Sequence, residues 1–261
     1  MLSVGVLAHG QVIRATNDFI LALGSPFRGL FQTMEQARAA VPHSRTFGYD
    51  NRQAAELYQQ CLTPRWGDYA LIYWLSRIIE SGSELLDIGG NIGIAFYAFD
   101  KYLCYPPDFK WVVYDLPASV EAGKRFVKDR PREALEFTAR LEDCPNPSIL
   151  LASGALQYID RPLSGMLASF ASRPKHVLVN KLPVYEGPAF VTLQDIGPSI
   201  CPYRVFNRAE FIATLTSSGY DLVDQWNIGD LRCRVRLHPS RSASYSGMYF
   251  KLSEQTASPR R

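Results

Sequence analysis

The sequence has few cysteines, and none of them are grouped. Its 261 residues include five cysteines, at Cys61, Cys104, Cys144, Cys201 and Cys233. Because no two of them have the C-x-x-C spacing, neither a zinc site nor a redox motif is indicated. An odd number of widely spaced cysteines does not predict a disulfide framework either. We therefore expect free thiols and a cytoplasmic protein.

A long apolar run and a surplus of one charge are also missing. No segment approaches the roughly 20 apolar residues that a membrane span needs, and the first residues, MLSVGVLAHGQVIR, do not read as a secretory signal. The 28 basic and 25 acidic residues nearly balance, giving a net charge of +3. Since phosphate recognition needs a clustered basic surface, we expect neither a nucleic-acid nor a membrane partner.

Hydrophobic periodicity divides the chain into two parts. Up to about residue 80, helical patterns dominate: Thr33 with Gln36 predicts a helix start, and so does Asn51. We expect residues 1–80 to form a mostly helical cap or substrate lid. Residues 81–252 alternate strand and helix patterns, and residues 253–261 are expected to form a flexible tail.

The second part predicts an α/β domain with an open sheet. Seven strands are expected, over residues 83–88, 110–114, 135–139, 148–153, 176–180, 220–226 and 247–252. Strands that alternate with helices are typical of a mostly parallel sheet. Ligands of such sheets bind beyond the carboxyl ends of the strands, so polar residues at those ends are the first candidates for a site.

The most informative segment is ELLDIGGNIG, residues 84–93. A strand leads through Asp87 into a glycine-rich turn, and a helix follows. Glycines allow the backbone to approach a ligand closely, and a helix N-terminus offers unpaired N–H groups. A dinucleotide fingerprint, G-x-G-x-x-G, would need glycine in place of Asn91 and Ile94. The turn therefore indicates a nucleotide-type ligand but argues against a nicotinamide dehydrogenase.

Two further strand ends have the same character. The segment WVVYDLP ends its strand at Asp115, whose carboxylate could accept hydrogen bonds from both hydroxyls of a ribose. The segment SILLASGALQYI leaves its strand through a short polar turn at Ser153 and Gly154. Each motif alone is weak, but together they occur in the order and spacing of one kind of nucleotide-binding sheet.

The three motifs together resemble those of class I S-adenosylmethionine-dependent methyltransferases. The run D-I-G-G-N-x-G is similar to motif I of that family, with Asn91 in place of the middle glycine; asparagine tolerates left-handed backbone well. Several other segments, GLFxTMEQA, FGYDN, VTLQ and PYRVFNR, are similar to a family of small bacterial methyltransferases with undefined substrates. The resemblance implies a Rossmann-like sheet, mostly parallel, whose last strand is antiparallel.

The same resemblance implies the ligands. The cofactor would be S-adenosylmethionine, its product S-adenosylhomocysteine, and the acceptor a small molecule methylated on O, N or C in a biosynthetic pathway. In the family, the acid at the first strand end organises the turn and the methionine ammonium. The residues carried over to cofactor binding are Asp87, Gly89, Gly90, Asn91, Gly93, Asp115, Leu116, Ser153 and Gly154.

Acceptor-side residues are expected at the later strand ends and in the cap. The candidates for substrate binding are Tyr49, Trp66, Gln157, Tyr158, Asn180, Gln194, Tyr203 and Asn207. Tyr158, Asn180 and His43 are also candidate catalytic residues, because a base helps when the acceptor is a hydroxyl or a protonated amine. Plainer interpretations remain open: His43 as a surface histidine and Asn207 as a helix cap. No metal-binding constellation is visible.

Two other interpretations of the same fold remain. A catalytically inactive, methyltransferase-like binding or scaffold protein is the main alternative, although the intact Asp87 and Asp115 argue against it. A nucleic-acid methyltransferase is disfavoured, because Gly-Ala-Leu-Gln stands where an Asn/Asp-Pro-Pro-Tyr motif is common. Helical caps often form dimer surfaces, so by analogy a homodimer is favoured over a monomer.

Overall fold

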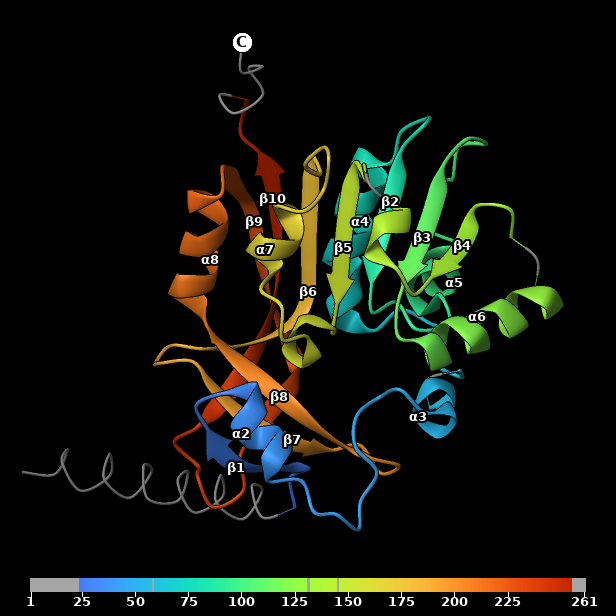
Figure 1. The fold of residues 1–261 in the computed structure, drawn as a ribbon. Coiled ribbons are helices and arrows are strands. Elements are labelled where there is room, and N and C mark those ends of the chain that lie inside the picture. The colour runs from blue at the N-terminus through green and yellow to red at the C-terminus, as the bar shows by residue number, and fades with distance from the viewer. Residues whose placement is uncertain (1–23, 58, 131, 145, 255–261) are drawn as a thin grey trace, which may run out of the picture.

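A computed structural model describes residues 24–57, 59–130, 132–144 and 146–254. The predictions for residues 1–23 and most of the expected tail lie outside this part. The centre of the molecule is a sheet in the order β4-β3-β2-β5-β6-β10-β9 (Figure 1). Its strands are β2 (Glu84–Ile88), β3 (Lys110–Tyr114), β4 (Leu135–Thr138), β5 (Ile149–Ser153), β6 (His176–Tyr185), β9 (Tyr220–Arg234) and β10 (Ser242–Leu252).

The first five of these strands are parallel, and β10 runs antiparallel to both β6 and β9. Consecutive residues of the inner strands point to opposite faces. Thus Leu85 belongs to the core on one face and Leu86 to the core on the other, and both are fully buried. This double burial explains why the inner strands are almost continuously apolar, as parallel strands covered on both faces are.

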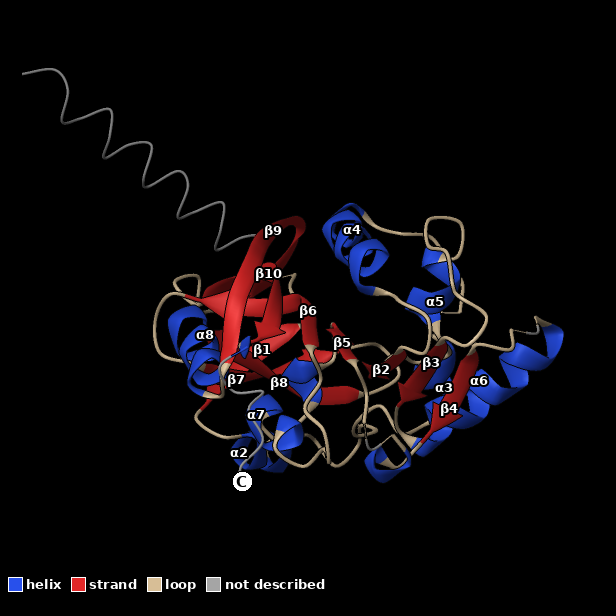
Figure 2. Ribbon diagram, turned by 90° about the horizontal axis from the view of Figure 1, so that it is seen from above, coloured by secondary structure: helices blue, strands red, loops and turns tan. Residues whose placement is uncertain are grey.

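Helices cover both faces of the central sheet (Figure 2). On one face lie α4 (Tyr69–Ile78) and α5 (Ile94–Phe99), and on the other α7 (Leu163–Leu167) and α8 (Arg208–Ser217). Helix α6 (Pro117–Asp129) packs against β4 and the short α3 (Arg52–Glu56). Among the described residues, no helix has the length and apolar character that crossing a membrane would require.

A second, antiparallel sheet stands beyond the carboxyl end of β6 (Figure 1). It consists of β1 (Phe27–Phe31), β7 (Phe190–Asp195) and β8 (Ile200–Asn207), with β7 in the middle. The last two residues of β6 pair with the end of β8, which joins the two sheets. Helix α2 (Met34–Ala39) packs its buried residues against β7 and β8. The second sheet therefore forms a lid over the strand ends.

The predicted α/β fold with a mostly parallel sheet is confirmed, but the described residues form ten strands rather than the seven expected. The three unpredicted strands form the lid, which differs from the expected helical cap. Only β1 and α2 of the lid come from the first 80 residues. Helix α4 belongs to the central domain, because Leu71 and Leu75 are fully buried in the core against the sheet.

The predicted helix starts are confirmed. Thr33 accepts a hydrogen bond from the backbone N–H of Gln36, and Asn51 accepts one from Ala54. Each of these bonds satisfies a donor that a helix N-terminus would otherwise leave unpaired. Asn51 thereby caps α3 two residues after Tyr49. The backbone N–H of Gly48, the residue before Tyr49, donates to the carbonyl of Ile200 in β8.

Candidate active site

A cavity of about 640 Å³ lies between the carboxyl ends of the central strands and the lid. Its walls come from the ends of β2, β3, β5 and β6, from the loop before α4, and from β7, β8 and β10. This is where open α/β sheets bind their ligands, and the volume lies within the range of small-molecule sites.

The glycine turn between β2 and α5 forms one wall of the cavity. Gly89 and Asn91 both adopt left-handed backbone, with φ of 69° and 55°. A Cβ on Gly89 would collide with Ala155, and one on Gly90 would collide with the Asp87 carboxylate. The turn can therefore present bare backbone to a ligand only with glycine at these two positions.

Gly93 was also predicted to lie at the cofactor. It does not line the cavity. It adopts φ of 85° at the start of α5, and a Cβ there would lie 2.9 Å from the side chain of Leu135. Glycine at this position thus allows α5 to pack closely against β4.

Asp87 is buried beneath the turn and lines the cavity. The indole N–H of Trp111 donates to its Oδ2 at 3.1 Å. Burial raises the pKa of Asp87 to about 7, the Trp111 hydrogen bond opposes this, and the neighbouring Asp115 adds to it. A cationic ligand group in the cavity would stabilise the charged form. The carboxyl group is therefore suited to a cationic ligand group.

Asp115 stands at the end of β3, on the other side of the turn. Its Oδ2 accepts a hydrogen bond from the backbone N–H of Asn91 at 2.8 Å, and its Oδ1 accepts one from Leu116 at 2.6 Å. Burial raises the pKa of Asp115, and these backbone hydrogen bonds oppose the shift. Each carboxylate oxygen has further lone pairs, so the group can also accept hydrogen bonds from paired hydroxyls.

Four tyrosines form the wall opposite the turn, and we call them the tyrosine wall: Tyr49, Tyr158, Tyr203 and Tyr245. Tyr158, in the short helix η3 (Leu156–Tyr158), packs edge to face against Tyr49 and Tyr203, with ring centroids 4.8 and 5.2 Å away. Its hydroxyl donates to Gln194 Oε1 at 2.6 Å and accepts from Tyr49 at 3.3 Å. Tyr203 and Tyr245 share a hydrogen bond, and burial raises the pKa of each, so these two phenols stay uncharged.

Gln157 lies where the turn after β5 meets this wall. Its Nε2 donates to the carbonyl of Gly154 at 2.9 Å, while its buried Oε1 has no hydrogen-bond partner among the described residues. An unpaired buried acceptor is costly unless something donates to it. Because Gln157 also lines the cavity, a donor group on a ligand would satisfy it.

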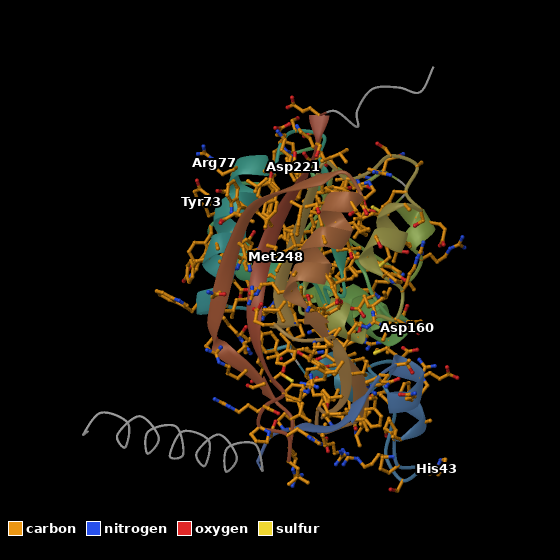
Figure 3. All side chains as sticks on the ribbon, turned by 90° about the vertical axis from the view of Figure 1, so that its left-hand side faces the viewer. His43, Tyr73, Arg77, Asp160, Asp221 and Met248 are labelled. Atoms are coloured by element: carbon orange, nitrogen blue, oxygen red, sulfur yellow. The ribbon has the colours of Figure 1, made fainter. Side chains whose placement is uncertain are left out.

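Four of the predicted acceptor-side residues do not line the cavity. His43 lies in an exposed loop at the lid end of the molecule (Figure 3), and Trp66 is 81% exposed. Asn207 caps α8 and donates to the carbonyl of Gly187. Asn180 is buried in hydrogen bonds with Asp68 and Trp226. The plainer interpretations of His43 and Asn207 therefore hold.

The structure adds four charged residues to the cavity lining that the sequence analysis missed: Arg65, Asp68, Arg161 and Lys181. Asp68 and Lys181 both line the cavity and form an ion pair, with Lys181 Nζ 2.8 Å from Asp68 Oδ1. Lys181 directly follows the predicted strand 176–180, so its position at a strand end was a usable signal. Asp68 carried none, because it follows no predicted strand. Among the described residues there is no cluster of three or more His, Cys, Asp or Glu arranged for a metal ion.

No model of a known protein family matches the sequence, and no curated protein does. Solved structures do match the fold. A glycopeptide N-methyltransferase, MtfA, with bound S-adenosylhomocysteine has a TM-score of 0.52 at 12% identity, over 78% of this chain and 98% of that chain. Magnesium protoporphyrin IX methyltransferase from Synechocystis, also with S-adenosylhomocysteine, has 0.52 at 9%, over 78% and 96%. The cyclase SpnF has 0.51 at 10%, over 87% and 98%.

At these identities the likeness concerns the fold alone. The chain has the fold of class I S-adenosylmethionine-dependent methyltransferases, as the motifs predicted. One of the three similar structures is a cyclase, so the fold by itself does not define the reaction. The reaction depends on the residues that line the cavity.

Proposed function

We propose that this protein transfers a methyl group from S-adenosylmethionine to an O, N or C atom of a small molecule, in a biosynthetic pathway of the bacterial cytoplasm. The observation that carries the proposal is the pairing of the bare glycine turn with Asp87 and Asp115, at the ligand-binding edge of this fold.

The residues present fit the cofactor. Asp115 would accept hydrogen bonds from the ribose hydroxyls, and Asp87 would face the methionine ammonium from beneath the turn. Gly89 and Gly90 would let the backbone approach the ligand, with Leu116, Ser153 and Gly154 along its edge. When bound, the cofactor supplies a methyl group activated by its sulfonium. The protein must then orient the acceptor and exclude water, which the lid favours.

A small organic acceptor fits the rest of the cavity better than a macromolecule. Lid residues and the tyrosine wall line the cavity together with the glycine turn, in a volume of about 640 Å³. The two similar methyltransferases act, by their names, on a glycopeptide and on a porphyrin. A small organic acceptor for this chain is therefore in keeping with the acceptors of these two enzymes.

The proposal is tested by isothermal titration of the purified protein with S-adenosylmethionine and with S-adenosylhomocysteine. We expect micromolar binding that Asp115→Ala abolishes. The matched control is Asp221→Ala, an exposed aspartate at the far end of β9 (Figure 3), which should bind as the wild type does. If folded wild-type protein binds neither ligand, methyl transfer is refuted and the inactive binding or scaffold protein is favoured.

We further propose a homodimer. Trp66, Tyr69 and Tyr73 expose 81%, 46% and 55% of their surface along the start of α4, and Tyr102 packs edge to face on Tyr69. Contiguous exposed aromatic side chains are typical of association surfaces. Light scattering should give twice the chain mass for the wild type and a single chain mass for a Trp66→Ser, Tyr73→Ser double variant. A wild-type monomer at high concentration would contradict this.

A further inference from the structure

Asn180 and Lys181 are consecutive residues of β6, yet both side chains reach the same oxygen. Asp68 Oδ1 accepts a hydrogen bond from Asn180 Nδ2 at 2.9 Å and lies 2.8 Å from Lys181 Nζ. In a regular strand, consecutive side chains point to opposite faces of the sheet. The backbone must therefore depart from regular geometry here.

A β-bulge provides that departure. The pairing of β6 with β10 shifts between Leu182, opposite Ser246, and Val179, opposite Met248. Two residues of β6 consequently face a single residue of β10, and Lys181 adopts left-handed backbone with φ of 53°. This conformation is strained for residues other than glycine. Bulges are enriched beside active sites, where they redirect side chains.

Asp68 is fixed from several sides. Besides the two side chains of β6, its Oδ2 accepts the backbone N–H of Arg65 at 3.0 Å. The preceding Gly67 packs so closely on β9 that a Cβ would lie 2.7 Å from Ile228. Trp226 in turn donates its indole N–H to Asn180 at 3.0 Å. The charge of Asp68 is thereby shared among three donors, and the Lys181 ammonium is held in one place.

Lys181 lines the cavity beside the end of β5. Lys181 packs beside Gly154 at the end of β5, where a Cβ on the glycine would lie 3.7 Å from that of Lys181. Its side chain is a quarter exposed and lines the same cavity as the tyrosine wall. An ammonium has three N–H donors, and Asp68 engages one of them. The remaining donors are available to a ligand oxygen.

The tyrosine wall indicates the shape of that ligand. The Tyr158 ring stands nearly perpendicular to those of Tyr49 and Tyr203, at 69° and 81°. Aromatic rings meeting at such angles leave flat faces and edges that suit a planar ring packed against them. An oxygen carried by that ring could then reach the ammonium.

We propose that Lys181 binds the reacting oxygen of the acceptor as an oxyanion, and that the acceptor is a planar aromatic molecule with an acidic hydroxyl, of the phenol class. The proposal rests on the proposed methyl transfer. On binding, the hydroxyl proton leaves to solvent and the ammonium keeps all of its own protons. A lone pair of the oxygen forms the new O–C bond, and the pair of the breaking C–S bond stays on sulfur. Lys181 thus acts as a binding cation, and no base is required at the moment of transfer.

The test uses 4-nitrophenol, whose anion is yellow, as the probe. The probe is titrated by absorbance into the whole protein saturated with S-adenosylhomocysteine, over a range of pH. For the wild type we expect the bound probe to show a preference for the anion of about tenfold or more over the free probe. Lys181→Met should lose this preference, and Lys181→Arg should retain a large part of it. Lys101→Met, at an exposed lysine away from the cavity, should match the wild type.

Binding of S-adenosylhomocysteine is measured first on every variant. Its absence in the wild type refutes the proposed methyl transfer, and this inference with it. If it binds, three results overturn the inference alone: no binding of the probe, binding without preference for the anion, or an unchanged preference in Lys181→Met. A loss of S-adenosylhomocysteine affinity in Lys181→Met beyond about threefold would also overturn it, because Lys181 would then serve the cofactor.

Discussion

Replacing Asp87 by asparagine should stabilise the folded protein while abolishing cofactor binding. Asp87 lies fully buried beneath the glycine turn, with one hydrogen bond from Trp111. Burial raises its pKa to about 7, against an ordinary value of 3.8. The charged form is therefore unfavourable in the empty site, and asparagine preserves the size and an acceptor for Trp111 without the charge.

The pH dependence follows from the sign of this shift. Below about pH 4 the carboxyl is protonated in both states, so it contributes no pH-dependent difference. As the pH rises towards 7, the unfolded chain loses the proton while the folded chain keeps it, and folding becomes less favourable. Each pH unit in this window costs about 1.4 kcal/mol. Between pH 5 and pH 8 the wild type should thus lose about 3 kcal/mol relative to Asp87→Asn, with no further change above that.

The assay is urea unfolding of both proteins at pH 5, 6, 7 and 8, followed by tryptophan fluorescence. Asp221→Asn, at an exposed site, serves as the control and should follow the wild type at every pH. A free-energy difference between wild type and Asp87→Asn that stays constant from pH 5 to pH 8 would show that Asp87 is not held in a desolvated, protonated state. Retained binding of S-adenosylhomocysteine by Asp87→Asn would refute its assignment to the methionine ammonium.

Three further changes probe the turn, the bulge and the boundary of the lid. Gly90→Ala should weaken S-adenosylhomocysteine binding at least about tenfold in calorimetry, because its Cβ would displace the Asp87 carboxylate; unchanged affinity would mean that the turn adapts. Lys181→Gly should be more stable to urea than Lys181→Met by about 1 kcal/mol, since glycine adopts the left-handed backbone freely; equal stability would show that the bulge is unstrained. Leu75→Ala should cost about 2–5 kcal/mol of unfolding free energy, because α4 packs in the central core; a loss below 1 kcal/mol would place α4 with the lid.

The sequence was informative where local pattern and tertiary role coincide. Strands β2, β3 and β5 are short apolar runs buried on both faces, so composition alone indicates them. The strands of the lid are different. Gly29 and Pro202 stand inside β1 and β8, where both residue types normally indicate a loop. Strand β1 forms by pairing with β7, more than 150 residues further along the chain, and no local window contains both segments.

The same distinction applies to the candidate site. Asp87 and Asp115 end strands beside a glycine turn, so short motifs were enough to predict that they line the cavity. Lys181 depends on the register of β6 against β10 and on Asp68, which lies 113 positions earlier in the chain. Asn180 was expected at the acceptor, but its side chain is hydrogen-bonded to Asp68 and Trp226 and does not line the cavity. Register shifts of this kind leave no trace in the alternation of apolar and polar residues.

The most direct test of the cofactor site is a crystal structure of the protein grown with S-adenosylhomocysteine. We expect the ribose hydroxyls within hydrogen-bond distance of the Asp115 carboxylate and the amino-acid portion over Gly89 and Gly90, with its ammonium towards Asp87. Electron density for the ligand at another place on the protein, or none in crystals soaked well above the measured dissociation constant, would contradict the assignment.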